Sequence, residues 1–346
     1  MKAARMAHLD LVRVYATVLV ALVHVSATPV VQLAGLRNGD WWVANSFDSF
    51  SRTCVPLFIM ASGAAVLEQA RFASMSEFFR RRVVKIVLPA TFWIAFYYCF
   101  RCWLMGEALT VSRFAAVFLD GSAFYHLPFI YILLSLYVAA PLLVRIVDPT
   151  DAAISKYFAW TWFGLAIALP FVEVRVGLHL GMPVYVATGY AGYFGLGRIL
   201  RDVEVGRVAC VTCAGIIGVG SLCTAIATSV LASESGSFQY AWYDYLMPVV
   251  VVMSISTFML LSSRIAREWL QERKRIARAI TWISGQSYGI YLVHPLFLTL
   301  FQLRGITWDI MGPTIGIPFL AMLGMVTALL FVQFLRLSRF SAWLVP

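Results

Sequence analysis

The first hydrophobic segment, Leu9–Val31, decides the fold; it reads LDLVRVYATVLVALVHVSATPVV. It is long enough to cross a bilayer, for which a helix needs about 20 predominantly apolar residues. Arg13 and His24 interrupt it, although a charge at bilayer depth costs at least about 2.5–3.5 kcal/mol. In an α-helix the two residues lie about three turns, or roughly 16 Å, apart along nearly the same face. We therefore expect this face to line a cavity inside a membrane protein.

The composition is that of an integral membrane protein. Of the 346 residues, 61% are hydrophobic and only 13% are charged, and the mean hydropathy is +0.81. Charged residues make up about 25% of an ordinary soluble domain. In a soluble protein a net charge of +10 would suggest a nucleic-acid partner. In a membrane protein, Lys and Arg collect in the cytoplasmic loops, and this topology accounts for the positive charge. We therefore expect no nucleic-acid partner.

Windows of about 20 apolar residues predict ten membrane-spanning helices joined by short connections. The predicted spans are residues 9–30, 53–70, 85–105, 124–146, 157–175, 184–200, 207–231, 245–263, 279–301 and 315–336. The longest connection follows the first span and contains Arg37, Trp41 and Trp42. The sequence thus predicts an all-α polytopic bundle that forms one membrane domain over residues 1–346, with no soluble domain.

The distribution of cations predicts the orientation of this bundle. Twenty of the 27 Lys and Arg residues fall in segments on the same side as the N-terminus, and five fall in the opposite loops. Arg13 and Arg101 lie within spans. Because cytoplasmic loops collect Lys and Arg, we expect both termini in the cytoplasm, in a multi-pass protein of the cell inner membrane.

Three of the five histidines are expected at one depth, near the outer surface. His24 and His294 each lie about 15 residues into spans that begin inside, and His126 begins a span that starts outside. Histidine accepts a proton near neutral pH, so a group of three favours a functional chamber over interfacial histidines held by backbone or water. Three histidines can also hold zinc, but His24 and His294 have no carboxylate three or four residues further along. We expect no metal.

A basic cluster precedes the third span, where residues 78–85 read FFRRRVVK. Its cations, Arg80, Arg81, Arg82 and Lys85, suit phosphates or anionic lipid heads, and a plain topology signal is the simpler interpretation. Arg101, near the outer end of the same span, is a secondary candidate.

Four stretches resemble a known family, the acyltransferase-3 group of ten-helix membrane acyltransferases. Arg13 and His24 fit its Arg-x10-His first helix, and residues 55–63 (VPLFIMASG) resemble its second helix. Residues 79–89 (FRRRVVKIVLP) resemble the basic stretch before its third helix, and residues 287–295 (SYGIYLVHP) its S-[FY]-G-I-Y-x-x-H-P stretch. Residues 126–142 (HLPFIYILLSLYVAAPL) are similar to the subgroup that acetylates surface polysaccharides.

The resemblance implies transfer of an acyl group, usually acetyl, from acetyl-CoA to a hydroxyl of an envelope or exported polysaccharide or a lipid-linked sugar. Acetyl-CoA would be a co-substrate, with no bound cofactor. The resemblance also implies that Arg13 and His24 are needed for activity and that the basic cluster meets the CoA phosphates. The family's Arg-x-x-Arg reads here as Arg82-x-x-Lys85, which keeps the charge but weakens bidentate phosphate contact.

We therefore expect His24 to act as the base and Arg13 to orient the donor or neutralise charge on the thioester. His126, His294 and Tyr291 would lie on the acceptor side. Ser62, at mid-membrane depth, leaves open whether an acyl-enzyme forms. The expected partners are the acyl-CoA donor, the glycan acceptor, membrane lipids and polysaccharide synthesis or export machinery.

Two alternatives stay open at this point. A transporter or flippase of a lipid-linked saccharide also uses buried Arg and His, although such proteins often carry inverted repeats, and none is found in this sequence. An acyltransferase with a longer or succinyl donor is the other alternative. The acceptor sugar, its linkage and the oligomeric state are not determined by the sequence.

Overall fold

The computed structural model describes residues 2–72, 74–147, 150–168, 171–172, 184–338 and 341–346, which form helices and turns with no strand among them. This confirms the predicted all-α class. The helices are α1 (Lys2–Gln32), α2 (Gly39–Ser51), α3 (Cys54–Phe72), α4 (Met75–Arg82), η1 (Val83–Val87), α5 (Leu88–Met105), α6 (Val111–Asp120), α7 (Pro128–Ile146), α8 (Ala152–Trp162), η2 (Phe163–Ala168), α10 (Val184–Leu200), α11 (Arg207–Ser235), η3 (Ala241–Tyr243), α12 (Pro248–Leu261), α13 (Arg264–Glu272), α14 (Lys274–Ser284), α15 (Ser287–Leu303), α16 (Pro313–Arg336) and η4 (Ala342–Leu344).

Seven helical stretches of the described residues are long and apolar enough to cross a membrane. They are Ala7–Gln32, Gly39–Glu68, Met75–Met105, Pro128–Ile146, Arg207–Ser235, Ala241–Glu272 and Pro313–Arg336, and α15 is a shorter apolar helix. The predicted span at 157–175 extends into residues outside the described part of the chain. The number of ten spans and the cytoplasmic position of both termini therefore stay predictions.

The connection after α1 is not a loop, as the sequence suggested, but largely the helix α2. Asn38 caps this helix, and its side-chain oxygen accepts a hydrogen bond from the Trp41 backbone N–H at 3.0 Å. Trp41 is fully buried, and its Nε1 donates to the Val30 carbonyl at 3.0 Å. Polar residues in α2 lower the local hydropathy, which is why an apolar window starts the span only at residue 53. Several of these polar residues are themselves buried, among them Asn45 and Asp48.

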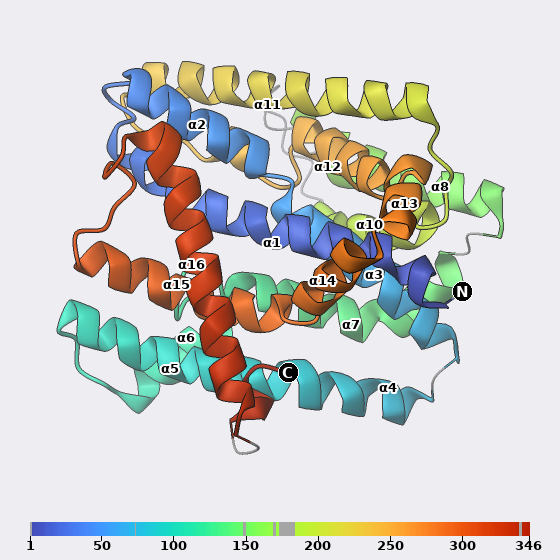
Figure 1. The fold of residues 1–346 in the computed structure, drawn as a ribbon, viewed down its shortest axis with the longest axis horizontal. Coiled ribbons are helices and arrows are strands. Elements are labelled where there is room, and N and C mark those ends of the chain that lie inside the picture. The colour runs from blue at the N-terminus through green and yellow to red at the C-terminus, as the bar shows by residue number, and fades with distance from the viewer. Residues whose placement is uncertain (1, 73, 148–149, 169–170, 173–183, 339–340) are drawn as a thin grey trace.

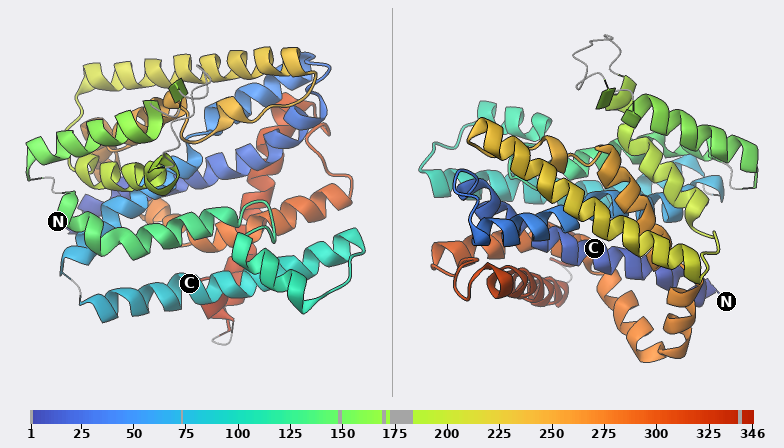
Figure 2. Two further views of the ribbon diagram at one scale, coloured as in Figure 1. Left: turned by 180° about the vertical axis from the view of Figure 1, so that it is seen from behind. Right: turned by 90° about the horizontal axis from the view of Figure 1, so that it is seen from above.

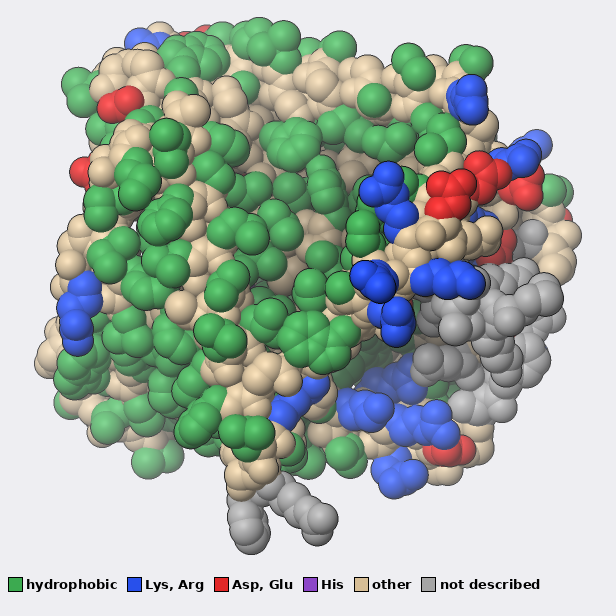
Figure 3. Space-filling model, in the orientation of Figure 1, with side chains coloured by type: hydrophobic (Ala, Val, Ile, Leu, Met, Phe, Trp, Pro, Cys, Tyr) green, Lys and Arg blue, Asp and Glu red, His purple; other side chains and the backbone are tan. Residues whose placement is uncertain are grey.

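Helix α1 lies in the middle of the bundle (Figure 1), in contact with α2, α3, α14, α15 and α16. Helix α11 runs along one edge, where it packs against α12 and α2 (Figure 2). In the face shown in Figure 3, hydrophobic side chains cover the middle of the molecule, and most Lys and Arg gather toward the end at which α1 begins. The residues of α1 are thus surrounded by other helices over most of their length.

Helices α3 and α10 pack unusually closely because glycines face the partner backbone. A Cβ on Gly63 would lie 1.9 Å from the Phe194 carbonyl oxygen, and one on Gly197 would lie 2.0 Å from the Met60 carbonyl oxygen. Small residues permit such close approach between membrane helices. This contact holds α3, which carries Phe58 and Ser62, firmly against the rest of the bundle.

Candidate active site

Three imidazoles from separate segments meet near the end of the bundle at which α1 ends. The ring centroids of His24 in α1 and His294 in α15 are 5.3 Å apart and stacked. His126, two residues before α7, lies with its ring centroid 6.0 Å from that of His294. Tyr125 packs its ring edge-on to His24 at 4.7 Å. The structure thus brings together the three histidines that the sequence placed at one depth.

The three histidines differ in how their ring nitrogens are used. His294 Nδ1 lies 3.0 Å and 2.9 Å from the carbonyl oxygens of Ile290 and Tyr291, and since carbonyls only accept, Nδ1 is the protonated nitrogen. His294 Nε2 and both nitrogens of His126 are buried and have no hydrogen-bond partner among the described residues. His24 is half-buried, and neither of its nitrogens is hydrogen-bonded to a described residue. His24 is therefore the imidazole that a ligand can reach.

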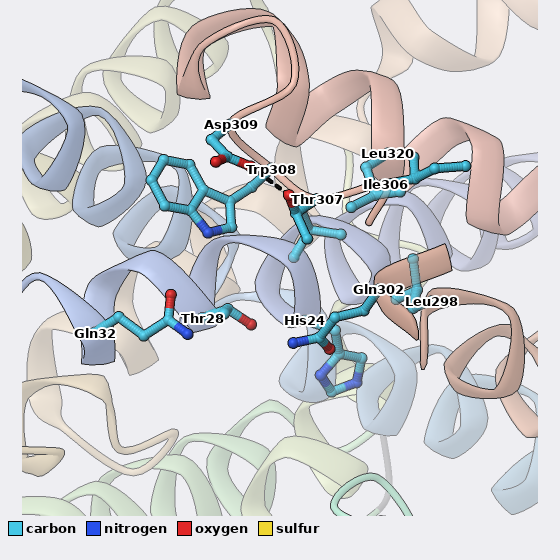
Figure 4. Close-up of a pocket in the computed structure, with 11 residues that line it drawn as sticks. His24, Thr28, Gln32, Leu298, Gln302, Ile306, Thr307, Trp308, Asp309 and Leu320 are labelled. Carbon is cyan, nitrogen blue, oxygen red and sulfur yellow. Dashed lines mark hydrogen bonds between the residues drawn. The ribbon is translucent and has the colours of Figure 1, made fainter. Parts of the chain in front are cut away.

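The first of three cavities that meet at His24 lies between α1 and the α15–α16 segment (Figure 4). It has a volume of about 210 Å³. In the close-up, Thr28 and Gln32 of α1 face Gln302 of α15, and Thr307, Trp308 and Asp309 of the following loop close the cavity on the opposite side. Its walls therefore carry amides, hydroxyls and an indole beside the imidazole.

The other two cavities extend from His24 toward the α11–α12 connection and α7. A cavity of about 550 Å³ shares Thr28, Gln32 and Gln302 with the first and continues to Tyr240 and Tyr245. A third, of about 350 Å³, is lined by Tyr125, His126, Tyr190, Asp244 and Tyr291. Together the three form a polar and aromatic chamber that His24 lines in each of its parts. We call these three cavities the outer chamber.

A buried ion pair forms one wall of the outer chamber. Arg52 Nε donates to Asp48 Oδ1 at 2.6 Å, and Ser26 Oγ donates to Asp48 Oδ2 at 3.2 Å. The guanidinium carbon lies 4.0 Å from the ring centroid of Tyr243 and 5.4 Å from that of Tyr240. Arg52 is one of the five cations that the sequence assigned to the loops opposite the N-terminus, just before the predicted span 53–70, and the sequence prediction missed this pair. Its i,i+4 spacing was the available signal, but only once residues 39–51 are recognised as a helix.

A separate cavity of about 370 Å³ lies toward the end at which α1 begins, and we call it the basic cavity. Arg13, Lys85, Ser62, Tyr137 and Tyr288 are among its lining residues. Arg13 is therefore one of two cations in its wall, and it shares a helix with His24 of the outer chamber.

The orientation of Arg13 is determined by a carboxylate. Arg13 Nη1 lies 3.2 Å from Asp10 Oδ1. Asp10 also accepts hydrogen bonds from Ser284 Oγ at 2.8 Å and Thr281 Oγ1 at 3.0 Å, both in α14. Asp10 thus links α1 to α14 and limits the rotamers available to Arg13.

The four cations of the basic cluster have different surroundings. Arg80 and Arg81 are exposed, and Arg81 pairs with Glu77. Arg82 is buried, with its guanidinium carbon 4.0 Å from the ring centroid of Phe78. Lys85 lies in the π-helical turn η1 and reaches the basic cavity. π-helical turns are frequent at functional sites, and here the turn presents Lys85 on the cavity side of the helix.

The remaining candidate residues from the sequence, Arg101, Ser62 and Tyr291, lie in different parts of the structure. Arg101 donates to the Ser122 carbonyl at 2.9 Å and lies 3.9 Å from Glu107 Oε2, in the α5–α6 region. Ser62 lines the basic cavity. The Tyr291 hydroxyl donates to the His126 carbonyl, and its ring lines both the basic cavity and the outer chamber.

A family model described as an acyltransferase domain, Acyl_transf_3, matches residues 6–334, which is nearly the whole chain. The chain belongs to the acyltransferase-3 family. The match makes this protein a multi-pass membrane acyltransferase and confirms the resemblance that the four sequence stretches carried. No curated protein and no solved structure matches it significantly.

Proposed function

We propose that this acyltransferase transfers an acetyl group from acetyl-CoA to a hydroxyl of an envelope or exported polysaccharide or lipid-linked sugar, with His24 as the base. One observation carries this proposal: a single helix presents Arg13 to a basic cavity and, about three turns further on, His24 to a chamber of different chemistry. A donor held from one end and an acceptor held from the other would then meet near His24.

The basic cavity suits an acyl-CoA donor. CoA carries phosphates, and Arg13 and Lys85 are the types of side chain that bind them. Arg13 lies roughly 16 Å from His24 along the helix, too far to contact a carbonyl at His24. We therefore assign Arg13 to holding the donor rather than to stabilising charge on the thioester. Arg80 and Arg81, exposed in the same segment, would attract the polyanion to the membrane surface.

The outer chamber suits a sugar acceptor. Gln32, Gln302 and Thr28 offer donors and acceptors for several hydroxyls. Tyr240 and Trp308 contribute aromatic faces that can pack against the apolar face of a sugar ring while their polar atoms remain free to hydrogen-bond. A few placed polar groups among aromatic walls are the usual composition of a specific ligand pocket.

The transfer step needs one base. His24 takes the proton from the acceptor hydroxyl as its oxygen bonds to the thioester carbonyl carbon. The carbon–sulfur bond then breaks, and the proton passes from His24 to the CoA sulfur, which leaves as the thiol. The stacked His294 donates its Nδ1 proton to backbone carbonyls, so in its neutral form it adds no positive charge that would oppose protonation of His24.

We propose that the protein lies in the inner membrane of the cell, where acetyl-CoA would be supplied from the cytoplasm. The acceptor would be delivered by polysaccharide synthesis or export machinery on the opposite side. Membrane lipids would surround the exposed apolar faces of α5, α11 and α16, which carry many of the exposed large hydrophobic residues.

The test uses purified protein in lipid nanodiscs, radiolabelled acetyl-CoA, and the envelope glycan fraction of a producing strain that lacks the gene. We expect wild type to label the glycan and His24→Gln to lose about 10²–10⁴-fold in rate, the usual contribution of a general base. His8→Gln, on the same helix but near its start, serves as the matched control and should retain the wild-type rate. Both variants should elute and melt like wild type.

Two results would contradict the proposal. Glycan labelling by His24→Gln at the wild-type rate would exclude His24 as the base. Movement of a lipid-linked saccharide across vesicle membranes without CoA, together with no labelling by wild type, would instead favour a transporter or flippase.

A further inference from the structure

Three aromatic side chains are shared by the basic cavity and the outer chamber. Phe58 of α3, Phe129 of α7 and Tyr291 of α15 line both the basic cavity and the chamber's 350 Å³ cavity. Arg13 and Lys85 belong to the first of these cavities, and His24 and His126 to the second. The three aromatic residues therefore form a partition between the site that would hold the donor and the imidazole that would act on it.

The rings of the partition touch one another in a row. The ring centroids of Phe58 and Phe129 are 6.2 Å apart, and those of Phe129 and Tyr291 are 5.5 Å apart at an interplanar angle of 68°. Both distances fall within the range of direct aromatic contact. Neighbouring rings in this row are therefore in contact, with no gap between Phe58 and Phe129 or between Phe129 and Tyr291.

The members of the partition differ in mobility. The Tyr291 ring is buried, and its hydroxyl donates to the His126 carbonyl, which fixes its position. Phe58 and Phe129 are half-buried, and they pack against the hydrophobic core without a polar atom to anchor their rings. Their displacement from the row breaks no hydrogen bond. Phe58 and Phe129 are consequently the two rings that can part.

We propose that Phe58 and Phe129 select the acyl group of the donor by its cross-section, so that a linear chain passes the partition and a branched one does not. The inference rests on the proposed use of acyl-CoA. The acyl end of the donor leads, since the phosphates stay with the cations of the basic cavity, and it must move between the two rings to reach His24. A branch at the carbon next to the carbonyl widens the leading end at the narrowest point of the path.

Two isomeric donors isolate this effect. Butyryl-CoA and isobutyryl-CoA have the same atoms and closely similar hydrophobicity, and they differ only in the branch. The rate of CoA release is measured for each with wild type, Phe58→Ala and Phe129→Ala in nanodiscs, with the envelope glycan fraction as the acceptor and acetyl-CoA as the reference donor. Phe96→Ala is the matched control, because Phe96 is also a half-buried phenylalanine in an aromatic row but packs on Trp93 and Phe100 of α5.

We expect the ratio of isobutyryl to butyryl rates to rise about tenfold or more in both partition variants, a size of discrimination typical of apolar pockets. Phe96→Ala should keep the wild-type ratio. Phe58→Leu and Phe129→Leu, which disturb packing less, should give intermediate ratios. Comparing ratios between variants cancels the lower intrinsic reactivity of the branched thioester.

An unchanged ratio in Phe58→Ala, Phe129→Ala and the leucine variants, with acetyl-CoA still used, would overturn the selection by these rings and leave the proposed function intact. A wild type that consumes none of the three donors would overturn the proposed function, and this inference with it.

Discussion

The buried ion pair between Asp48 and Arg52 gives the most quantitative prediction about stability. Both side chains are almost inaccessible, with exposed fractions of 0% for Asp48 and 5% for Arg52. Asp48→Ala removes the carboxylate and leaves a guanidinium buried against Tyr243 and Tyr240. Breaking such a pair from one side costs about 3–5 kcal/mol, because the remaining charge loses its partner. The rings of Tyr243 and Tyr240 still contact the desolvated guanidinium in the variant, so we expect a cost near the lower end of this range, about 3 kcal/mol.

The assay is equilibrium unfolding of purified protein in mixed micelles, followed by circular dichroism. A double variant, Asp48→Leu with Arg52→Met, removes both charges and should recover most of the lost free energy of unfolding. Glu268→Ala is the control: Glu268 pairs with Arg264 at the same i,i+4 spacing, but with exposed fractions of 53% and 71%. Exposed pairs contribute about 0–1 kcal/mol, so this variant should unfold nearly like wild type.

Two outcomes would contradict this prediction. The first is a cost of Asp48→Ala no larger than that of Glu268→Ala. The second is a double variant as unstable as Asp48→Ala, since the cost would then come from lost packing in α2 rather than from an unpaired charge.

Further predictions concern packing and positioning. Gly63→Ala should prevent or strongly impair folding, seen as aggregation on size-exclusion chromatography, because its Cβ would lie 1.9 Å from a backbone oxygen of α10. Asp10→Asn should raise the KM for acetyl-CoA more than it lowers kcat, because Arg13 loses an ionic partner that orients it; an unchanged KM would speak against this role. Tyr291→Phe leaves the His126 carbonyl without its hydroxyl donor and should lower the free energy of unfolding by about 1–3 kcal/mol in the same micelle assay; a wild-type value would show that another donor replaces it.

The fold class, the family and the proximity of the three histidines could be predicted from the sequence. These features follow from the helical repeat and from depth in the bilayer. Long apolar helices determine the depth of His24 and His294, and the Arg-x10-His spacing places His24 on nearly the same helix face as Arg13. The predicted depth of a histidine and its spacing from Arg13 change little when a helix end is misplaced by a few residues.

Other parts of the site depend on tertiary burial, which hydropathy does not report. Helix α2 was missed because its buried polar side chains, such as Asn45 and Asp48, have the hydropathy of a loop. Asn45 Nδ2 donates to the Ala225 carbonyl at 2.9 Å, a partner 180 residues away in sequence. Tyr240 and Tyr243, which line the outer chamber, lie in a connection that no periodic pattern assigns to the site.

The roles of the cations in the basic cluster also depend on tertiary structure. The sequence grouped Arg80, Arg81, Arg82 and Lys85 in one cluster, but a π-helical turn directs Lys85 to the basic cavity while Arg82 packs on Phe78. Side-chain direction in such a turn differs from that of a regular helix, so spacing alone cannot assign the phosphate ligand.

In the mechanism that we propose, the donor and the acceptor approach His24 from opposite sides of the membrane. Sealed proteoliposomes with one known orientation of the protein test this arrangement. Acetyl-CoA is enclosed with the end at which α1 begins, and the envelope glycan fraction is supplied to the opposite face. We expect that this arrangement acetylates the glycan, whereas acetyl-CoA and glycan supplied together on the His24 side give no product. Equal acetylation with both substrates on that one side would contradict it.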